Sequence, residues 1–349
     1  MISPSGPRNA RIMLVGEAPT GSELRMGLPF VGSAGQELRR MLKKANFREA
    51  EIFFTYVFFT QPEKNDVKNF CASKTVVGKS YPLPPLATGK YVLPEHLHNL
   101  TRLEAEIRSV NPDLIIAVGN TACWALLQRT GISKLRGSVF PNALVEDGPP
   151  VFPTYHPSAV VRQWELRTIA IMDLIKAKRF LDEGFHPPRR ELWLTPTIEE
   201  CEEFCERFIF GVPVPLLSFD VETLARTVTC IGFAATPDRA LTIPFYDPTA
   251  EDKNYWPTAA LERRAWNLVR KVLESPIPKL GQNGLYDIQY CYTWKIKVSN
   301  YEHDTMIRHH ALYPELEKGL GFMGSIYTDE APWKLLRARN KDNLKIDDE

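Results

Sequence analysis

The stretch from Gly16 to Gly35 constrains the fold of this chain most strongly. It directly follows an apolar run, residues 11–15 with the sequence RIMLV, which is typical of a buried parallel strand. The glycine- and proline-rich stretch is therefore expected where a strand ends, and open α/β sheets bind ligands at that edge. Glycines allow a ligand to approach the backbone closely, and Phe30 offers a flat apolar face. The pattern predicts either a pocket for a planar polar molecule or an ordinary strand-to-helix connection.

Further apolar segments alternate with amphipathic ones along the first half of the chain. The predicted strands cover residues 51–59, 113–119 and 151–155, and the predicted helices cover 36–45, 96–110, 120–130 and 161–183. Apolar side chains recur at helical spacing in the helical segments, which fits helices that cover a sheet. This alternation predicts a three-layer α/β/α domain with a parallel sheet over residues 1–186.

Three separated motifs in this predicted domain resemble those of the uracil-DNA glycosylase superfamily, closest to its family 4 branch. They are GEAP at 16–19, GLPFVGSAG at 27–35 and YHPSA at 155–159, in the order that the family has them. The resemblance covers roughly residues 8–182. It implies an activity in which a pyrimidine is flipped from the DNA stack and its glycosidic bond is cleaved.

The resemblance also implies roles for individual residues of these motifs. Glu17 would position or activate water, and His156 would stabilise the charge that builds on the leaving pyrimidine. Gly16, Glu23 and Phe30 would bind the substrate, with the base stacked on Phe30 and contacted by Glu23.

Two departures from the family 4 pattern leave a second interpretation open. Family 4 enzymes carry an iron-sulfur cluster on four cysteines that begin near the N-terminus, whereas the first cysteine here is Cys71, so we expect no cluster. An asparagine that reads the uracil edge in the family is matched by Tyr56 or its neighbours, and a tyrosine is bulkier and has a single hydroxyl. The first domain is therefore either a glycosylase or a non-catalytic DNA-binding module.

The distribution of charge fits contact with DNA. Residues 1–186 contain 23 Lys and Arg against 17 Asp and Glu, and the remaining residues contain 20 against 25. A basic half suits a polyanion, and an acidic half suits a metal-dependent site. The long segment 61–95 is either a DNA phosphate contact or a solvated loop, and its lysines are Lys64, Lys68, Lys74, Lys79 and Lys90.

A second domain is predicted over residues 213–349, after a linker and connecting helix at 187–212. Its centre is a strand at 217–223 in which Asp220 and Glu222 are two residues apart. On a strand such side chains share one face, and they can bind the same hard cation. Two more strands, at 227–235 and 239–245, follow as a hairpin-like pair and suggest an RNase H-like mixed sheet.

Three motifs of this second half resemble those of the DnaQ-like 3′→5′ exonuclease domain of family A DNA polymerases, particularly the bacteriophage enzymes. They are FDVET at 219–223, NGLYD at 283–287 and HDTM at 303–306. The resemblance implies that Asp220, Glu222 and Asp287 are catalytic ligands of Mg²⁺ or Mn²⁺ and that Asn283 binds substrate. The fourth motif of the family, Tyr-x-x-x-Asp, is missing, so we expect little exonuclease activity from these 349 residues.

The two resemblances together suggest the N-terminal region of a phage-type family A DNA polymerase. The expected partners are DNA, as a single strand or a primer-template, and a polymerase domain on a continued or separate chain. The alternative is an inactive fragment whose first domain only binds DNA. No apolar run approaches the ~20 residues of a membrane span, and no signal peptide opens the chain. We therefore expect no membrane partner and a cytoplasmic location in a bacterial host.

Overall fold

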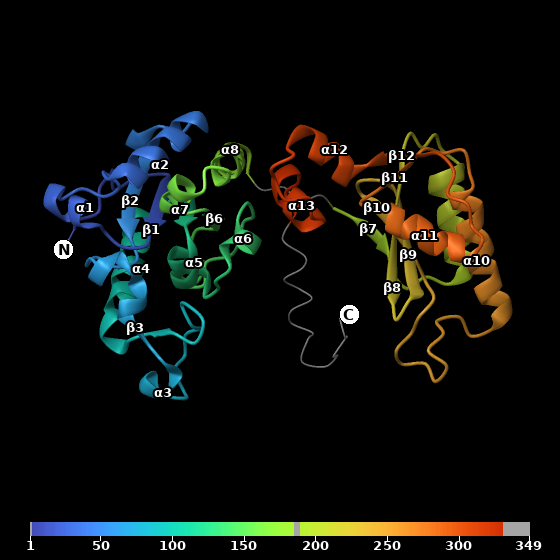
Figure 1. Cartoon of the computed structure of the whole chain (residues 1–349), viewed down its shortest axis with the longest axis horizontal. Coiled ribbons are helices and arrows are strands. Elements are labelled where there is room, and N and C mark those ends of the chain that lie inside the picture. Colours follow the sequence, from blue (N-terminus) through green and yellow to red (C-terminus); the bar gives the residue numbers. More distant parts are fainter. Residues whose placement is uncertain (1, 185–188, 331–349) are drawn as a thin grey trace. The chain divides into compact units, whose positions relative to one another are not determined.

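The computed structural model describes residues 2–184 and 189–330 of the chain, and they form two units (Figure 1). The first unit comprises Met1–His186 together with Gly321–Glu349, and the second comprises Pro187–Leu320. The division differs from the predicted boundaries at two places. The region predicted as a linker and connecting helix is part of the second unit, to which it contributes a short strand and that helix, and residues 321–330 belong to the first unit.

A four-stranded parallel sheet is the centre of the first unit. Its strand order is β2 (Ile52–Tyr56), β1 (Ile12–Gly16), β5 (Leu114–Val118) and β6 (Val151–Thr154). All four strands are buried and apolar, as their sequences predicted. Because the strands are parallel, their carboxyl ends share one edge of the sheet.

Helices cover this sheet in separate layers (Figure 1). The helices α4 (His98–Val110) and α5 (Asn120–Leu127) pack in one core cluster with Met13 and Val15 of β1. The helix α2 (Ser33–Lys44) packs against α7 (Pro157–Arg162) and α8 (Leu166–Glu183). The predicted α/β fold with a parallel sheet is confirmed.

Two local features of the first unit differ from the prediction. The single helix expected at 161–183 is divided into α7 and α8, and α7 begins earlier because Pro157 suits the first turn of a helix. A short helix, α1 (Gly21–Met26), lies within the glycine-rich stretch. Thr20 and Glu23 form a capping box at its start, so this stretch is not a simple loop.

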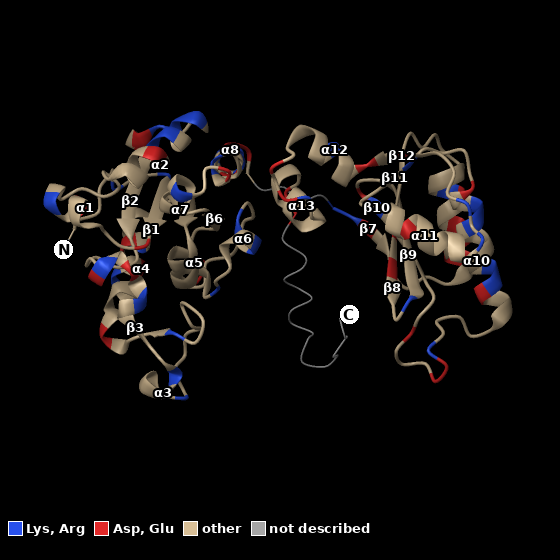
Figure 2. Ribbon diagram, in the orientation of Figure 1, with Lys and Arg blue, Asp and Glu red and all other residues tan. Residues whose placement is uncertain are grey.

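The segment 61–95 contains a small ribbon of β3 (Cys71–Ala72) and β4 (Tyr91–Val92) and a short helix, α3 (Lys74–Val77). The indole nitrogen of Trp124 donates to the Pro84 carbonyl oxygen at 2.8 Å and ties the segment to the core. Its five lysines are all exposed, and Figure 2 shows basic positions around α3.

A six-stranded mixed sheet is the centre of the second unit. Its order is β12 (Tyr301–Asp304), β11 (Lys279–Gly281), β8 (Leu217–Leu224), β9 (Thr227–Thr236), β10 (Arg239–Pro244) and β7 (Glu191–Trp193). The pairs β8–β9 and β9–β10 are antiparallel, whereas the pairs β11–β12, β11–β8 and β10–β7 are parallel. The mixed sheet and the central hairpin agree with the sequence prediction.

Four helices complete the second unit. They are α9 (Ile198–Phe204), which continues as a π-helical turn over Cys205–Phe210, α10 (Ala259–Leu273), α11 (Leu285–Thr293) and α12 (Thr305–Leu312). The helices α9 and α10 contact each other and share the core of the unit, and α11 contacts β8. The contact of α11 with β8 brings the NGLYD motif beside the FDVET motif.

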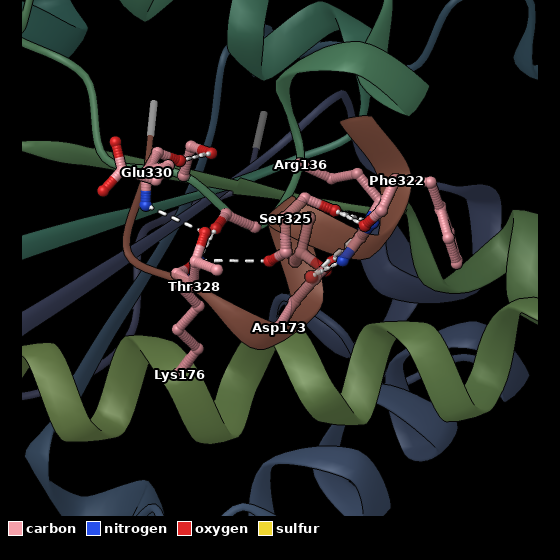
Figure 3. Close-up of polar contacts among 10 residues, drawn as sticks. Arg136, Asp173, Lys176, Phe322, Ser325, Thr328 and Glu330 are labelled. Carbon is pink, nitrogen blue, oxygen red and sulfur yellow. Dashed lines mark hydrogen bonds and ion pairs between the residues drawn. The ribbon is translucent and has the colours of Figure 1, made fainter. Parts of the chain in front are cut away.

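The helix α13 (Leu320–Tyr327) carries the chain back to the first unit (Figure 3). Arg136 and Asp173 form a fully buried ion pair, and Arg136 also donates to the Ser325 hydroxyl at 2.8 Å. Lys176 donates to the carbonyl oxygens of Gly137 at 2.6 Å and Ser325 at 3.1 Å. These polar contacts explain why residues 321–330 join the first unit, although they were predicted to belong to the exonuclease domain.

None of the helices in the described ranges combines the length and the apolar character that a bilayer crossing requires. Residues 185–188, which include the start of the predicted linker, and the segment 331–349 lie outside the described residues.

Candidate functional sites

Glu17 follows β1 at the carboxyl edge of the parallel sheet. The hydroxyl of Thr121, in the first turn of α5, donates to its carboxylate. Burial raises the pKa of Glu17, and the hydrogen bond from Thr121 acts in the opposite direction. Thr121 was not identified from the sequence, although its place directly after the strand ending at Val118 puts it at the same edge.

His156 begins α7 and caps it with its imidazole ring. Its Nδ1 accepts from the backbone N–H of Ser158 at 3.2 Å and lies 2.6 Å from the Ser158 hydroxyl. Burial, together with the nearby charge of Arg162, lowers the pKa of His156 to about 4. The ring is therefore neutral at pH 7. Since a backbone N–H can only donate, Nδ1 must be the acceptor, and the ring proton is on Nε2.

Glu17 and His156 each lie against the segment that joins β5 to α5. Glu17 contacts Thr121, and the Cβ of His156 would lie only 2.9 Å from a Cβ placed on Gly119. Gly119 has a φ of 88°, so this position favours glycine both sterically and conformationally. The charge of Arg162 acts on both Glu17 and His156. Two residues 139 positions apart in the printed sequence thus share one sheet edge.

Phe30 and Tyr56 stack on each other beside this edge. Their ring centroids are 4.7 Å apart with an interplanar angle of 29°. The Tyr56 hydroxyl accepts from the Phe30 backbone N–H at 2.9 Å and donates to Glu23 at 2.8 Å. Each of the two rings is only 2% exposed.

Gly16 and Glu23 support this aromatic pair. A Cβ on Gly16 would lie 2.6 Å from the Phe30 ring and 2.9 Å from the Tyr56 ring, so only glycine fits there. The second carboxylate oxygen of Glu23 accepts from the backbone N–H of Thr20 at 2.7 Å and from its hydroxyl at 2.8 Å. Both oxygens of this predicted base contact therefore have partners inside the protein.

Three predicted carboxylates gather around β8 in the second unit. Asp220 and Glu222 alternate with buried residues and are exposed on one face of the strand. Asp287, in the first turn of α11, accepts from the backbone N–H of Val221 at 2.7 Å. Burial raises the pKa of Asp287 to about 6, and the negative charges of Asp220 and Glu222 contribute to the shift. Asp287 is thus close enough to Asp220 and Glu222 to be affected by their charges.

These carboxylates match the chemistry of a magnesium or manganese site, since both ions prefer oxygen ligands. In the described part of the chain, however, no group of three His, Cys, Asp or Glu side chains is arranged so that it could hold a metal ion. Asn283 is exposed at the turn before α11 and has a φ of 57°.

Asp304, from the HDTM motif, holds that turn in place. Its carboxylate accepts from the backbone N–H of Gly284 at 2.9 Å, from that of Met306 at 2.8 Å and from the Tyr301 hydroxyl at 2.7 Å. Burial raises the pKa of Asp304, but the hydrogen bonds, led by that of Tyr301, outweigh burial and leave the pKa lowered. By accepting from the Gly284 N–H, Asp304 therefore positions the turn at the start of the NGLYD motif.

All six cysteines lie within the described ranges and are free thiols. The predicted absence of an iron-sulfur cluster stays a prediction.

Comparison with protein families matches residues 3–178 to the uracil DNA glycosylase superfamily. The type-4 uracil-DNA glycosylase of Thermotoga maritima is 31% identical over 180 residues, which are 50% of this chain and 80% of that protein. The type-4 enzyme of Pyrobaculum aerophilum is 29% identical over 167 residues, covering 46% of this chain and 74% of that enzyme.

A DNA polymerase of Bacillus phage SP01 is 26% identical over 201 residues, which are 57% of this chain but 18% of the polymerase. Among solved structures, the EXD2 exonuclease domain soaked in Mg and dGMP has a TM-score of 0.27 and 14% identity. That similarity covers 45% of this chain and 78% of the EXD2 chain.

Proposed function

Because the chain belongs to the uracil DNA glycosylase superfamily, we propose that its first unit excises a pyrimidine from DNA and that its second unit trims DNA from the 3′ end. The similarity to a phage DNA polymerase supports a place in phage DNA replication, with a family A polymerase domain as the functional partner. The observation that carries the glycosylase proposal is the neutral His156 at the same sheet edge as Glu17.

Excision requires a donor for the base and a group that positions water. As the bond between C1′ and the base nitrogen breaks, its electron pair moves onto the pyrimidine, whose carbonyl oxygen gains negative charge. The neutral ring of His156 carries its proton on Nε2, and this N–H donates a hydrogen bond to that oxygen. Glu17 positions the water that adds to the oxocarbenium-like sugar and accepts the proton that this water loses, while the pyrimidine leaves as an anion and takes up a proton from solvent. Phe30 and Glu23 hold the base, and Gly16 allows its close approach.

This proposal is tested by incubating the 349-residue protein with DNA that contains uracil or a 5-modified pyrimidine, in single- and double-stranded form. Abasic sites are then detected as alkali-labile breaks. We expect Glu17→Gln and His156→Ala each to reduce excision by roughly 100-fold or more. Glu146→Gln, an exposed position outside the site, is the control and should not change it. The absence of abasic product from every substrate would refute the enzyme proposal.

A second candidate function for the first unit is base sensing without bond cleavage. The packing of Tyr56 over Phe30 favours it, since this packing covers the predicted stacking face. Sensing predicts that the protein binds modified DNA more tightly than unmodified DNA, that Glu17→Gln binds equally well, and that neither releases a base.

For the second unit, we propose that Asp220, Glu222 and Asp287 hold Mg²⁺ or Mn²⁺ and that Asn283 contacts the DNA strand. The raised pKa of Asp287 supports this proposal, because the charges of Asp220 and Glu222 contribute to it and a cation would offset them. Bound ions would activate water and stabilise the leaving 3′ oxygen. Residues 213–349 contain no Tyr-x-x-x-Asp sequence, so a fourth carboxylate has to come from elsewhere.

The nuclease proposal is tested with 5′-labelled single-stranded DNA in Mg²⁺ or Mn²⁺. We expect the 349-residue chain to show little digestion, and a chain extended through the missing motif to shorten the DNA from its 3′ end. Asp220→Ala in the extended chain should abolish digestion. An extended chain that is unaffected by Asp220→Ala would overturn the assignment of this site.

A further inference from the structure

The stacking face of Phe30 is occupied by the protein itself. The Tyr56 ring lies on it at 4.7 Å, close to the spacing expected for a stacked planar ligand. The other aromatic neighbour of Phe30 is Phe54, at 5.8 Å and tilted by 54°. A flipped base and the Tyr56 side chain therefore compete for the same space.

Two hydrogen bonds hold Tyr56 in this position. Its hydroxyl accepts from the Phe30 backbone N–H and donates to the Glu23 carboxylate, whose other oxygen is fixed by Thr20. Gly16 leaves room for both rings, because any side chain there would collide with them. Stacking on Phe30 thus fixes the ring of Tyr56, and the two hydrogen bonds fix its hydroxyl.

We propose that Tyr56 is the specificity-determining residue of the first unit and that it closes the base site until its ring moves away. The inference rests on the proposed base site, but it concerns binding and not bond cleavage. When Tyr56 leaves, it exposes the Phe30 face together with one N–H donor and one carboxylate acceptor.

The chemistry of these exposed groups defines what can replace the tyrosine ring. A ligand has to be flat, about the size of a six-membered ring, and must carry an acceptor for the Phe30 N–H beside a donor for Glu23. A pyrimidine that has an N–H next to a carbonyl oxygen meets both requirements. A ring without that N–H would leave one oxygen of the buried Glu23 carboxylate without a donor, which is costly.

The test measures binding of free uracil, in the absence of DNA, to the wild-type chain and to Tyr56→Gly by calorimetry and thermal shift. We expect Tyr56→Gly to bind uracil at least tenfold more tightly than the wild type. The control ligand is 1,3-dimethyluracil, which keeps the ring but lacks the N–H, and it should bind the variant at least tenfold more weakly than uracil. p-Cresol, which resembles the deleted side chain, should also bind and raise the melting temperature of the variant.

Tyr56→Asn is the second variant, for the case that Tyr56→Gly does not fold. Its amide is much shorter than the tyrosine side chain, so it should open the stacking face and leave the Phe30 N–H and one Glu23 oxygen available to the ligand. Equal binding of uracil to the wild type and the folded variants, or no binding to any of them, would overturn the proposal.

These outcomes are separate from those of the glycosylase assay. Tight binding of uracil to the opened variants with no abasic product would support the role of Tyr56 and refute excision. Excision by the wild type that is unchanged by Tyr56→Asn would support excision and refute closure by Tyr56.

Discussion

The two candidate sites are built on opposite electrostatic principles. In the first unit, the carboxylates of Glu17 and Glu23 and the imidazole of His156 are hydrogen-bonded to neighbours within the same unit. In the second unit, Asp287 is buried close to the like charges of Asp220 and Glu222. The polar groups of the first site thus have partners within the unit, whereas at the second site we propose that a bound cation offsets the like charges.

The difference decides what a ligand has to do at each proposed site. A base that stacks on Phe30 has to displace the Tyr56 ring. At the second site, we propose that a bound cation offsets the negative charges around Asp287.

The largest effect is expected at the buried ion pair of the first unit. Arg136→Ala leaves Asp173 buried without its main cation and removes the donor to Ser325, so we expect a loss of about 3–5 kcal/mol in the free energy of unfolding. Chemical denaturation followed by circular dichroism measures it. Arg11→Ala is the matched control, because its partner Asp113 is more than half exposed, and it should cost at most ~1 kcal/mol. Equal effects of the two variants would show that this ion pair does not anchor residues 321–330 to the first unit.

The second effect is a pH dependence that comes from His156. The folded chain keeps this ring neutral down to about pH 4, whereas the unfolded chain takes up a proton near its ordinary pKa of 6.5. The unfolded state therefore binds more protons between these values, and the free energy of unfolding of the first unit rises with pH across that window. The gain is at most about 3 kcal/mol, because each pKa unit corresponds to ~1.4 kcal/mol. His156→Gln should flatten the curve, and a wild-type curve that falls across this window would contradict the buried neutral ring.

The third effect concerns the repulsion in the second unit. Asp287→Asn keeps an oxygen that can accept from the Val221 N–H but removes the charge, so it should stabilise the metal-free unit at pH 7 by about 1–2 kcal/mol. The same variant should lose the rise in melting temperature that Mg²⁺ gives to the wild type. Asp304→Asn is the contrasting variant and should destabilise the unit, because Asp304 accepts several hydrogen bonds. Destabilisation by Asp287→Asn would show that the carboxylates do not repel each other significantly.

The smallest effect is expected from the exposed lysines of the segment 61–95. If they contact DNA phosphates, each contact adds roughly 0.7–0.9 to the slope of log affinity against log salt concentration. Replacing them with glutamine should flatten the slope measured by fluorescence anisotropy. The replaced set is Lys64, Lys68, Lys74, Lys79 and Lys90. An unchanged slope would make this segment a solvated part of the surface.

The sequence determined most of what depends on neighbouring residues. The apolar runs ending at Gly16 and Tyr56 identified parallel strands, and the loops after them were correctly placed at one sheet edge. The alternation at Asp220 and Glu222 likewise placed two carboxylates on one strand face. Such inferences succeed because backbone geometry fixes the direction of each side chain within an element.

Only the tertiary structure decided which partners these side chains have. Tyr56 packs on Phe30 across a separation of 26 residues, and Arg136 reaches Ser325 across 189. Asp304 holds the turn at Gly284, a role that its own motif does not indicate. No local pattern encodes such contacts, because they depend on how whole elements pack and on the need of buried polar groups for partners.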